Sequence, residues 1–258
     1  MNLPYIVPRV VRHFLPETLV RSLLRRKVII RPGIETRDAT GAVRRYLDVL
    51  AERGGSFHGK RVLVFGYGGR FEIAAGLLNE GAAHVVLVDP YAVPERGPRP
   101  RPDLITLVQA DVRIPQVLAS IAPVDFVLST SVFEHLQDVD GTTRALATLT
   151  RPDGAQIHFV DLRDHYFRYP FEMLCFSEST WRRWLNPTSH HNRYRLWDFR
   201  RVFEKYFGKV DLQIVSWNEV AFRKALPRIR PEFLSGVVEQ DTAEVVRVVL
   251  EAPRAPQK

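Results

Sequence analysis

The chain has 258 residues, of which 45% are hydrophobic and 26% charged, and this composition excludes a disordered protein and favours one large α/β core. Its single cysteine, Cys175, excludes both an internal disulfide framework and a cysteine-based metal cluster, so we expect a reducing, cytoplasmic location. No apolar run is long enough to span a bilayer, and no signal peptide or transmembrane segment is predicted. The formal net charge of +8 favours acidic partners but does not specify a fold.

Residues 1–58 are predicted to form an N-terminal helical cap. Apolar side chains recur at helical spacing over residues 7–30, and Pro16 divides this stretch into two short helices. Basic residues lie between the apolar ones, so contact of residues 7–30 with an anionic membrane surface is an alternative to packing on the main domain. A further helix is predicted over Ala42–Arg53, where a pair of glycines ends it.

From Lys60 onward, short apolar runs alternate with helical segments. Such runs are typical of parallel strands that are buried on both faces, so we predict a doubly wound, Rossmann-like α/β domain. Two later strands, Val210–Trp217 and Ala243–Leu250, are expected to pair as an antiparallel edge. The five predicted parallel strands are Arg61–Phe65, His84–Val88, Leu104–Val108, Asp125–Leu128 and Ala155–Val160.

A glycine-rich turn, Gly66-Tyr67-Gly68-Gly69, follows the first predicted strand directly. Glycine allows a backbone to approach a ligand closely, and the next helix begins nearby. Asp89 ends the second strand, where a carboxylate can accept hydrogen bonds from both ribose hydroxyls of a nucleoside. The turn and Asp89 therefore predict a nucleoside cofactor. The dinucleotide fingerprint requires a third glycine where Phe71 stands, which counts against NAD(P), although an NAD(P)-dependent oxidoreductase remains an alternative.

The order of motifs over Gly59–Leu250 resembles that of the class I S-adenosylmethionine (SAM)-dependent methyltransferases. Val62–Phe71 (VLVFGYGGRF) is similar to the family's first motif, whose glycine turn lies under the methionine part of SAM. The resemblance implies that Asp89 holds the ribose of SAM and that Ala110-Asp111-Val112 lies beside its adenine. The residues predicted to bind SAM are Gly66, Tyr67, Gly68, Asp89, Pro90, Asp111, Val112, Ser129 and Glu134.

Two further segments carry the resemblance. Ser129–Leu136 (STSVFEHL) is similar to the segment after strand four in small-molecule methyltransferases, with Glu134 and His135 as the usual pair, and Arg151–Gly154 is similar to the turn before strand five. The last strands of this family pair antiparallel, so the resemblance implies a seven-stranded sheet with an antiparallel last strand. The domain is expected to span residues 59–252, and residues 253–258 are expected to form a flexible tail. Val64 replaces the family's usual acid and Arg70 its third glycine, so a non-catalytic methyltransferase-like binding module is a second alternative.

The run Asp161-Leu162-Arg163-Asp164-His165 follows the fifth strand, at the sheet edge where ligands bind in such folds. It resembles a segment of bacterial methyltransferases that modify sugars or secondary metabolites, which implies O-methylation of a small polar acceptor such as a carbohydrate or natural product. Methyl transfer to a hydroxyl requires that the acceptor be oriented and lose its proton. A histidine near its unperturbed pKa can take up that proton at neutral pH. His165 is the first candidate for the base and His135 the second, with Asp161 as a further catalytic candidate; each could instead brace or orient the site.

Residues 162–197 form an aromatic and basic insertion, predicted to be a lid over the acceptor. Most of its aromatic side chains are expected to form the core of the lid. The acceptor is expected to be a small molecule, with anionic compounds among the candidates, and no nucleic acid is expected because the Asn/Asp-Pro-Pro-aromatic motif of base-amine methylation is missing. The residues expected to contact the substrate are Arg163, Arg168, Asn192, Arg193 and Tyr194.

No metal ion is predicted. A Glu-x-x-Glu-His motif after strand four can bind a divalent ion in quinone O-methyltransferases, but Ser131 stands here at its first position. The adjacent histidines His190 and His191 have no metal-ligand spacing of their own.

Overall fold

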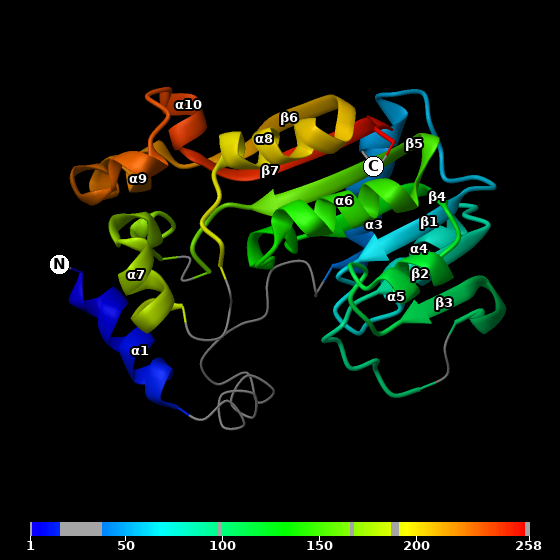
Figure 1. Cartoon of the computed structure of the whole chain (residues 1–258), viewed down its shortest axis with the longest axis horizontal. Coiled ribbons are helices and arrows are strands. Elements are labelled where there is room, and N and C mark those ends of the chain that lie inside the picture. The colour runs from blue at the N-terminus through cyan, green and yellow to red at the C-terminus, as the bar shows by residue number, and fades with distance from the viewer. Residues whose placement is uncertain (1, 16–37, 98–99, 166–167, 187–190, 256–258) are drawn as a thin grey trace.

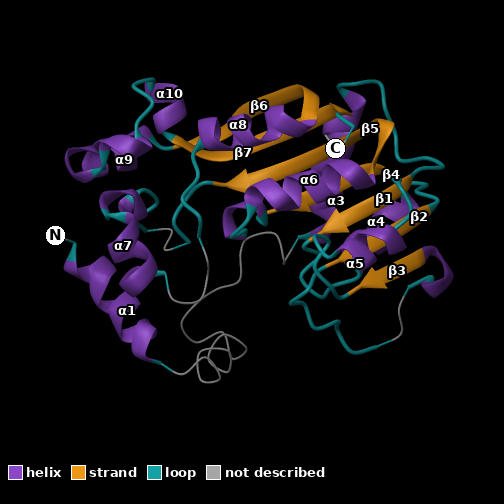
Figure 2. Ribbon diagram, in the orientation of Figure 1, coloured by secondary structure: helices purple, strands orange, loops and turns teal. Residues whose placement is uncertain are grey.

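The computed structural model describes residues 2–15, 38–97, 100–165, 168–186 and 191–255. In this part of the chain, seven strands form one sheet in the order β3-β2-β1-β4-β5-β7-β6, with helices on both faces (Figures 1 and 2). The strands are β1 (Arg61–Phe65), β2 (His84–Val88), β3 (Ile105–Val108), β4 (Val124–Thr130), β5 (Thr150–Asp161), β6 (Phe207–Trp217) and β7 (Ala243–Pro253).

The pairing confirms the predicted doubly wound sheet. Strands β1 to β5 pair in parallel, whereas β7 runs antiparallel to both of its neighbours, β5 and β6. The chain order therefore reverses between β1 and β4, which is where ligands bind in folds of this type.

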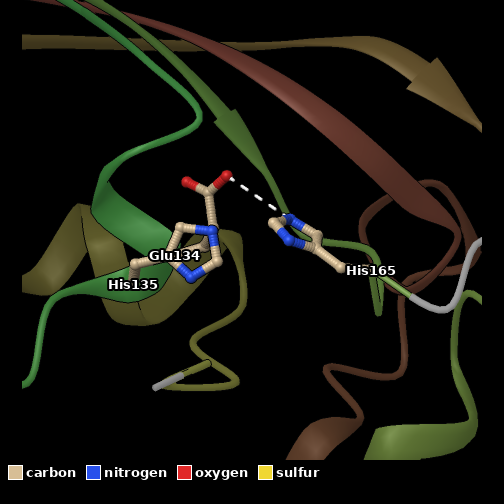
Figure 3. Close-up of side chains that lie close together, drawn as sticks. All are labelled: Glu134, His135 and His165. Carbon is tan, nitrogen blue, oxygen red and sulfur yellow. Dashed lines mark ion pairs between the residues drawn. The ribbon is translucent and has the colours of Figure 1, made fainter. Parts of the chain in front are cut away.

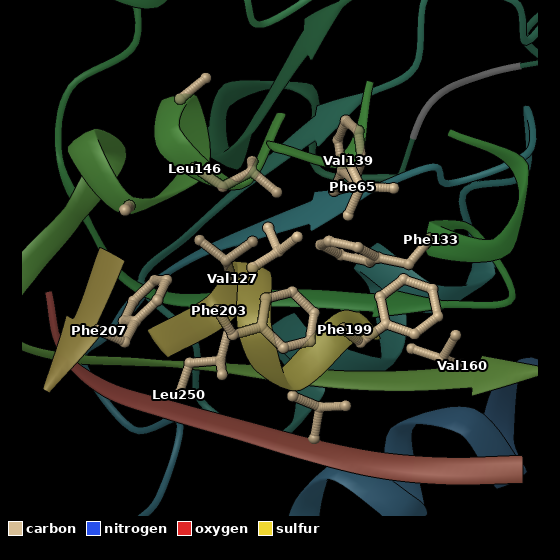
Figure 4. Close-up of a cluster of buried hydrophobic side chains, with 14 of the residues drawn as sticks. Phe65, Val127, Phe133, Val139, Leu146, Val160, Phe199, Phe203, Phe207 and Leu250 are labelled. Carbon is tan, nitrogen blue, oxygen red and sulfur yellow. The ribbon is translucent and has the colours of Figure 1, made fainter. Parts of the chain in front are cut away.

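Alternate side chains of each central strand face opposite helical layers. Val62 and Val64 of β1 pack into a core with α3 and α4, whereas Leu63 and Phe65 pack into the core under α5, α6 and α8. Figure 4 shows this second core, in which Phe133, Phe199 and Phe203 lie together. The helices are α3 (Ala39–Ala51), α4 (Glu72–Asn79), α5 (Pro115–Ser120), α6 (Val139–Leu149) and α8 (Leu196–Tyr206).

A third apolar cluster packs three separate parts of the chain together, and we call it the lid after the role predicted for residues 162–197. Tyr5 from α1 (Leu3–Phe14) packs with Phe171 and Trp181 of the insertion and with Phe222 of α9 (Glu219–Ala225). The insertion itself contains η4 (Glu172–Cys175), α7 (Glu178–Thr180) and η5 (Trp181–Leu185). In Figure 1 these helices gather at one end of the sheet, beside α10 (Val238–Asp241).

The lid is thus larger than the predicted insertion of residues 162–197. Within the predicted cap of residues 1–58, α1 packs into the lid through the buried Tyr5. Helix α3 instead packs on one face of the sheet, where Tyr46 and Leu50 are buried in the same cluster as side chains of β1. The second of the two helices predicted within residues 7–30 lies outside the described residues. None of the helices in the described part is both long and apolar enough to cross a membrane.

Candidate functional site

The glycine turn after β1 lies close against the end of β4. A Cβ atom on Gly66 would come within 2.4 Å of the Val132 side chain, and Gly66 has a φ of 77°, which favours glycine. The Gly66 N–H donates to the Val88 carbonyl at 2.8 Å, which ties the turn to β2. The turn therefore reaches both neighbouring strands at the carboxyl edge of the sheet.

A hollow opens between this turn, α3 and the end of β4. The Tyr46 and Thr130 hydroxyls, which are hydrogen-bonded to each other, form one wall; neither residue stood out in the sequence. Val64 closes the floor with an apolar side chain, while Arg70 stands half-exposed at the rim in a loose 3.6 Å ion pair with Glu72. The lining residues are Ala39, Ala42, Tyr46, Val64, Gly66, Tyr67, Gly68, Arg70, Glu72, Ile73 and Thr130.

Asp89 lies at the end of β2, beside the glycine turn. Its Oδ2 accepts a hydrogen bond from the Gly68 N–H at 3.1 Å, and its Oδ1 accepts from the N–H groups of Tyr91 and Ala92 at 2.9 Å. The following residue, Pro90, is exposed. The carboxylate therefore holds two turns together at the position predicted for ribose binding.

The predicted adenine segment is also ordered by local contacts. Asp111 accepts hydrogen bonds from the backbone and the guanidinium of Arg113, and the hydrogen bond to this side chain lowers the pKa of Asp111. Arg113 also donates to Asp138 at 3.1 Å. Val112 is buried in the core, so only its backbone faces the sheet edge.

The side chain of Ser129, a predicted cofactor contact, is buried and hydrogen-bonded inside the protein. Its hydroxyl bonds the His158 Nδ1 at 2.8 Å, and the His158 Nε2 lies 2.9 Å from the Gln156 side-chain oxygen. Complete burial lowers the pKa of His158 to about 3, so this imidazole is neutral at pH 7.

The structure brings Glu134, His135 and His165 together, as Figure 3 shows. The Glu134 carboxylate, which is 1% exposed, lies 3.9 Å from the His165 Nε2. The His135 and His165 rings are 4.6 Å apart between centroids, and the His191 ring packs edge-on against both. Two loops, after β4 and after β5, therefore meet in one cluster of a carboxylate and imidazoles.

Asn192 holds the first of these loops. Its side-chain amide donates to the carbonyls of Phe133 at 2.7 Å and Leu136 at 3.1 Å, and its own N–H donates to the Glu134 carbonyl at 2.9 Å. The short helix η3 (Phe133–His135) is thus clamped from outside. This side chain was predicted to contact the substrate; in the structure it positions Glu134 and His135.

Hydrogen bonds also hold the second loop, which follows β5 and leads to His165. Asp161 accepts three hydrogen bonds from Arg163, at 2.7 to 3.0 Å. The buried Asp164 accepts from the Tyr5 hydroxyl and from the Arg9 guanidinium of α1. Asp161, predicted as a catalytic candidate, is therefore engaged in holding the loop, and Tyr5 and Arg9 are positioning residues that the sequence did not reveal.

Arg193 and Arg168, two of the predicted substrate contacts, lie in different surroundings. Arg193 is 1% exposed and donates to the carbonyls of Met173 and Phe176 while pairing with Glu178, so its guanidinium lies inside the lid. Arg168 is exposed and lies over the Tyr169 ring. Tyr194 packs against Phe199, 5.4 Å between ring centroids.

Burial changes the protonation of the histidine cluster. It lowers the pKa of His165 to about 4, with the neighbouring His135 as the next largest cause, and it lowers the pKa of His191 as well. The sequence argument assumed an unperturbed pKa for His165, so this part of it was wrong. His165 is neutral at pH 7 and offers a lone pair, but it is a weaker base than a free imidazole.

The class I SAM-dependent methyltransferases are defined by a sheet with this strand order and an antiparallel β7. They also have a glycine turn after β1 and a carboxylate after β2. The positive φ of Gly66 and Gly68, the hollow beside them and the placement of Asp89 fit a nucleoside cofactor of this kind. The profile of a methyltransferase domain family matches residues 36–208. The chain belongs to this methyltransferase family, and it is a SAM-dependent enzyme.

Solved structures agree on the fold. Phosphoethanolamine N-methyltransferase 2 from Haemonchus contortus, in complex with phosphomonomethylethanolamine and S-adenosylhomocysteine, is 15% identical, with a TM-score of 0.51 over 82% of this chain and 53% of that chain. A complex of the same enzyme with SAM is 14% identical and has a TM-score of 0.50 over the same shares. This chain thus spans about half the length of that enzyme.

A SAM-dependent methyltransferase from Mesorhizobium loti is 17% identical, with a TM-score of 0.47 over 84% of this chain and 100% of that chain. No curated protein matches the chain. The family match gives no support to one alternative, an NAD(P)-dependent oxidoreductase.

Proposed function

We propose that this enzyme methylates an oxygen of a small polar molecule, with carbohydrates and hydroxylated natural products as the first classes to test. The observation that carries the proposal is the cluster of Glu134, His135 and His165 beside the glycine turn, which Val132 joins to η3. Bound SAM supplies an electrophilic methyl group. What remains for the protein is to hold an acceptor hydroxyl in line and to take up its proton.

The cofactor side of the site is assigned to the glycine turn and its surroundings. The backbone at Gly66 and Gly68 and the hydroxyls of Tyr46 and Thr130 would hold the methionine part of SAM. Asp89 would accept hydrogen bonds from the ribose, because its carboxylate lies at the end of β2. The backbone at Val112 and the carboxylate of Asp111 would lie along the adenine.

The acceptor side is assigned to the histidine cluster. His165 is 28% exposed whereas Glu134 is buried, so an acceptor hydroxyl reaches His165 first and can donate a hydrogen bond to its neutral ring. The Glu134 carboxylate, 3.9 Å from that ring, favours the arrival of a proton there. His135 packs against the His165 ring and orients it.

The hollow on the lid side favours an uncharged acceptor. Its lining includes Asn192 and Tyr194. It also contains four arginines (Arg12, Arg182, Arg193 and Arg201) and three acids (Glu178, Asp198 and Glu232), with Glu178 pairing both Arg182 and Arg193 and Asp198 pairing Arg201. Because this wall is close to charge-balanced, a neutral polyhydroxylated compound is the first acceptor to test and an anionic one the second.

The substitution His165→Ala tests this assignment. We expect SAM binding to stay within about twofold of the wild type, since His165 lies outside the cofactor hollow, while transfer of a labelled methyl group to hydroxyl acceptors falls by roughly 100-fold or more. His84→Ala, at the distant start of β2, is the matched control and should retain full activity. Full activity of the His165→Ala variant, or labelling of amines alone, would contradict the proposal.

A further inference from the structure

We propose that Glu134, His135 and His165 bind one divalent transition-metal ion, with Zn²⁺ as the ion of choice. The inference goes beyond the proposed function, because metal binding requires neither SAM nor an acceptor. The sequence predicted no metal at this site, since Ser131 interrupts the motif after β4; the third ligand comes instead from the loop after β5, a placement that only the fold supplies.

The geometry is close to that of a coordination sphere. One ligand atom from each of the three side chains lies within 4.8 Å of the other two, and the Glu134 Oε1 and His165 Nε2 are 3.9 Å apart. Around a tetrahedral zinc ion with bonds of about 2.1 Å, ligand atoms lie about 3.4 Å apart. Side-chain movements of about 1 Å therefore close the site around an ion. Figure 3 shows the Glu134 carboxylate directed at the His165 ring, with the His135 ring beside both.

The donor set selects the class of ion. Two imidazoles and one carboxylate match the three protein ligands of catalytic zinc sites and the facial triad of divalent iron sites, whereas Mg²⁺ and Ca²⁺ prefer oxygen ligands alone. His191 is adjacent, but its Nε2 lies 2.9 Å from the Arg163 carbonyl, so it braces the site and does not coordinate.

Hydrogen bonds outside the three ligands hold them in place. Asn192 clamps the turn that carries Glu134 and His135, and Asp164, next to His165, is held by Tyr5 and Arg9. Such outer contacts orient ligands in metal sites and restrict their side-chain movement.

The local charge also favours a cation. The Glu134 carboxylate places a buried negative charge 3.9 Å from the His165 Nε2, while the carboxylates of Asp161 and Asp164 are paired with Arg163 and Arg9. Three protein ligands leave at least one coordination position open. With the ion bound, the His165 lone pair is used in coordination, so an acceptor hydroxyl at the open position would give its more acidic proton to water; this last step alone rests on the proposed function.

The test uses full-length protein freed of metal by a chelator and titrated calorimetrically with ZnCl₂ and, separately, MgCl₂. We expect one equivalent of Zn²⁺ to bind and Mg²⁺ to bind far more weakly. Titration with Co²⁺ should give visible absorption bands typical of mixed nitrogen and oxygen ligation. Glu134→Gln, His135→Ala and His165→Ala should each weaken Zn²⁺ binding by more than about 100-fold, since even outer contacts cost 10- to 100-fold.

Glu80→Gln and His84→Ala, which change exposed or half-buried groups outside the cluster, are the controls and should bind Zn²⁺ like the wild type. Circular dichroism and thermal unfolding of each variant, measured in parallel, confirm that it is folded. Wild-type protein that binds no transition metal, or ligand variants that bind it unchanged, would overturn the inference. Metal binding without any methyl transfer to hydroxyls would instead overturn the proposed function and leave the metal site standing.

Discussion

The Asp89 carboxylate shapes the glycine turn, and it is also the group that we propose binds the ribose of SAM. Its oxygens accept from the N–H groups of Gly68, Tyr91 and Ala92, so it shapes the glycine turn before any cofactor is present. A carboxylate has about four acceptor positions, and these three contacts leave about one for a ribose hydroxyl. Cofactor binding and the shape of the turn are thus linked through this residue.

Replacing Asp89 by alanine should therefore weaken SAM binding strongly. Loss of charge-assisted hydrogen bonds of about 1.5–3 kcal/mol each predicts a decrease of at least about tenfold in affinity, measured by calorimetry. Asp153→Ala, an exposed carboxylate near the start of β5, is the control. Equal SAM affinity in Asp89→Ala and wild type would show that the ribose lies elsewhere.

Some of the site residues could be predicted from the sequence, and others could not. Glu134 and His135 could be found because they are adjacent in a recognisable segment, and His165 because it follows a strand end. The hydrogen bonds of Ser129, Asn192 and Arg193 could not, since each side chain is polar and has a partner 20 or more positions away along the chain.

At the scale of elements, helix α1 connects the lid to the loop after β5, which carries His165. Arg9 pairs with the buried Asp164, donates to the Leu185 carbonyl at 2.7 Å, and lies over the rings of Tyr5 and Trp181. An N-terminal helix thereby reaches the residue next to His165. The loop after β5 depends on α1 for its conformation.

Arg9→Ala should destabilise the protein by about 3 kcal/mol, because it leaves the Asp164 carboxylate buried without this cation. Arg223→Ala, which breaks an exposed pair with Glu219 on α9, should cost less than about 1 kcal/mol. Urea unfolding of both variants measures the difference. Equal losses would mean that the α1 contact contributes no more than an ordinary surface pair.

Elements differ in how well their sequences reveal them. The bounds of β1 and β2 match the prediction, because five apolar residues bounded by turns can be read locally. The position of α1 could not be read in this way: its amphipathic pattern predicts a buried face, but not whether the partner is the sheet or a lid whose residues lie more than a hundred positions away.

At the scale of the whole molecule, the sheet contains a buried polar chain across β4 and β5. His158 lies between Ser129 and Gln156, and Gln156 donates to Thr150 at 2.8 Å. Burial holds the pKa of His158 at about 3, whereas an unfolded histidine titrates near 6.5. The folded protein therefore requires the neutral ring.

Stability should fall as the pH falls. Below about pH 6.5 the unfolded chain binds a proton at His158 that the folded chain cannot, so the contribution present above pH 6.5 is lost progressively toward pH 3. Between pH 7 and pH 5 this residue alone should cost about 2 kcal/mol. His158→Gln should be less stable than the wild type at pH 7 but lose less on acidification, as thermal unfolding at both pH values would show. An unchanged loss would exclude His158 as the source.

The central claim, that the edge of this sheet binds SAM, is tested most directly by calorimetric titration of the purified protein with SAM, S-adenosylhomocysteine and NADH. The glycine turn, the hollow between α3 and β4, and Asp89 predict that SAM and S-adenosylhomocysteine each bind with one site per chain and that NADH does not. Binding of NADH alone, or of none of the three by protein shown to be folded, would contradict the account.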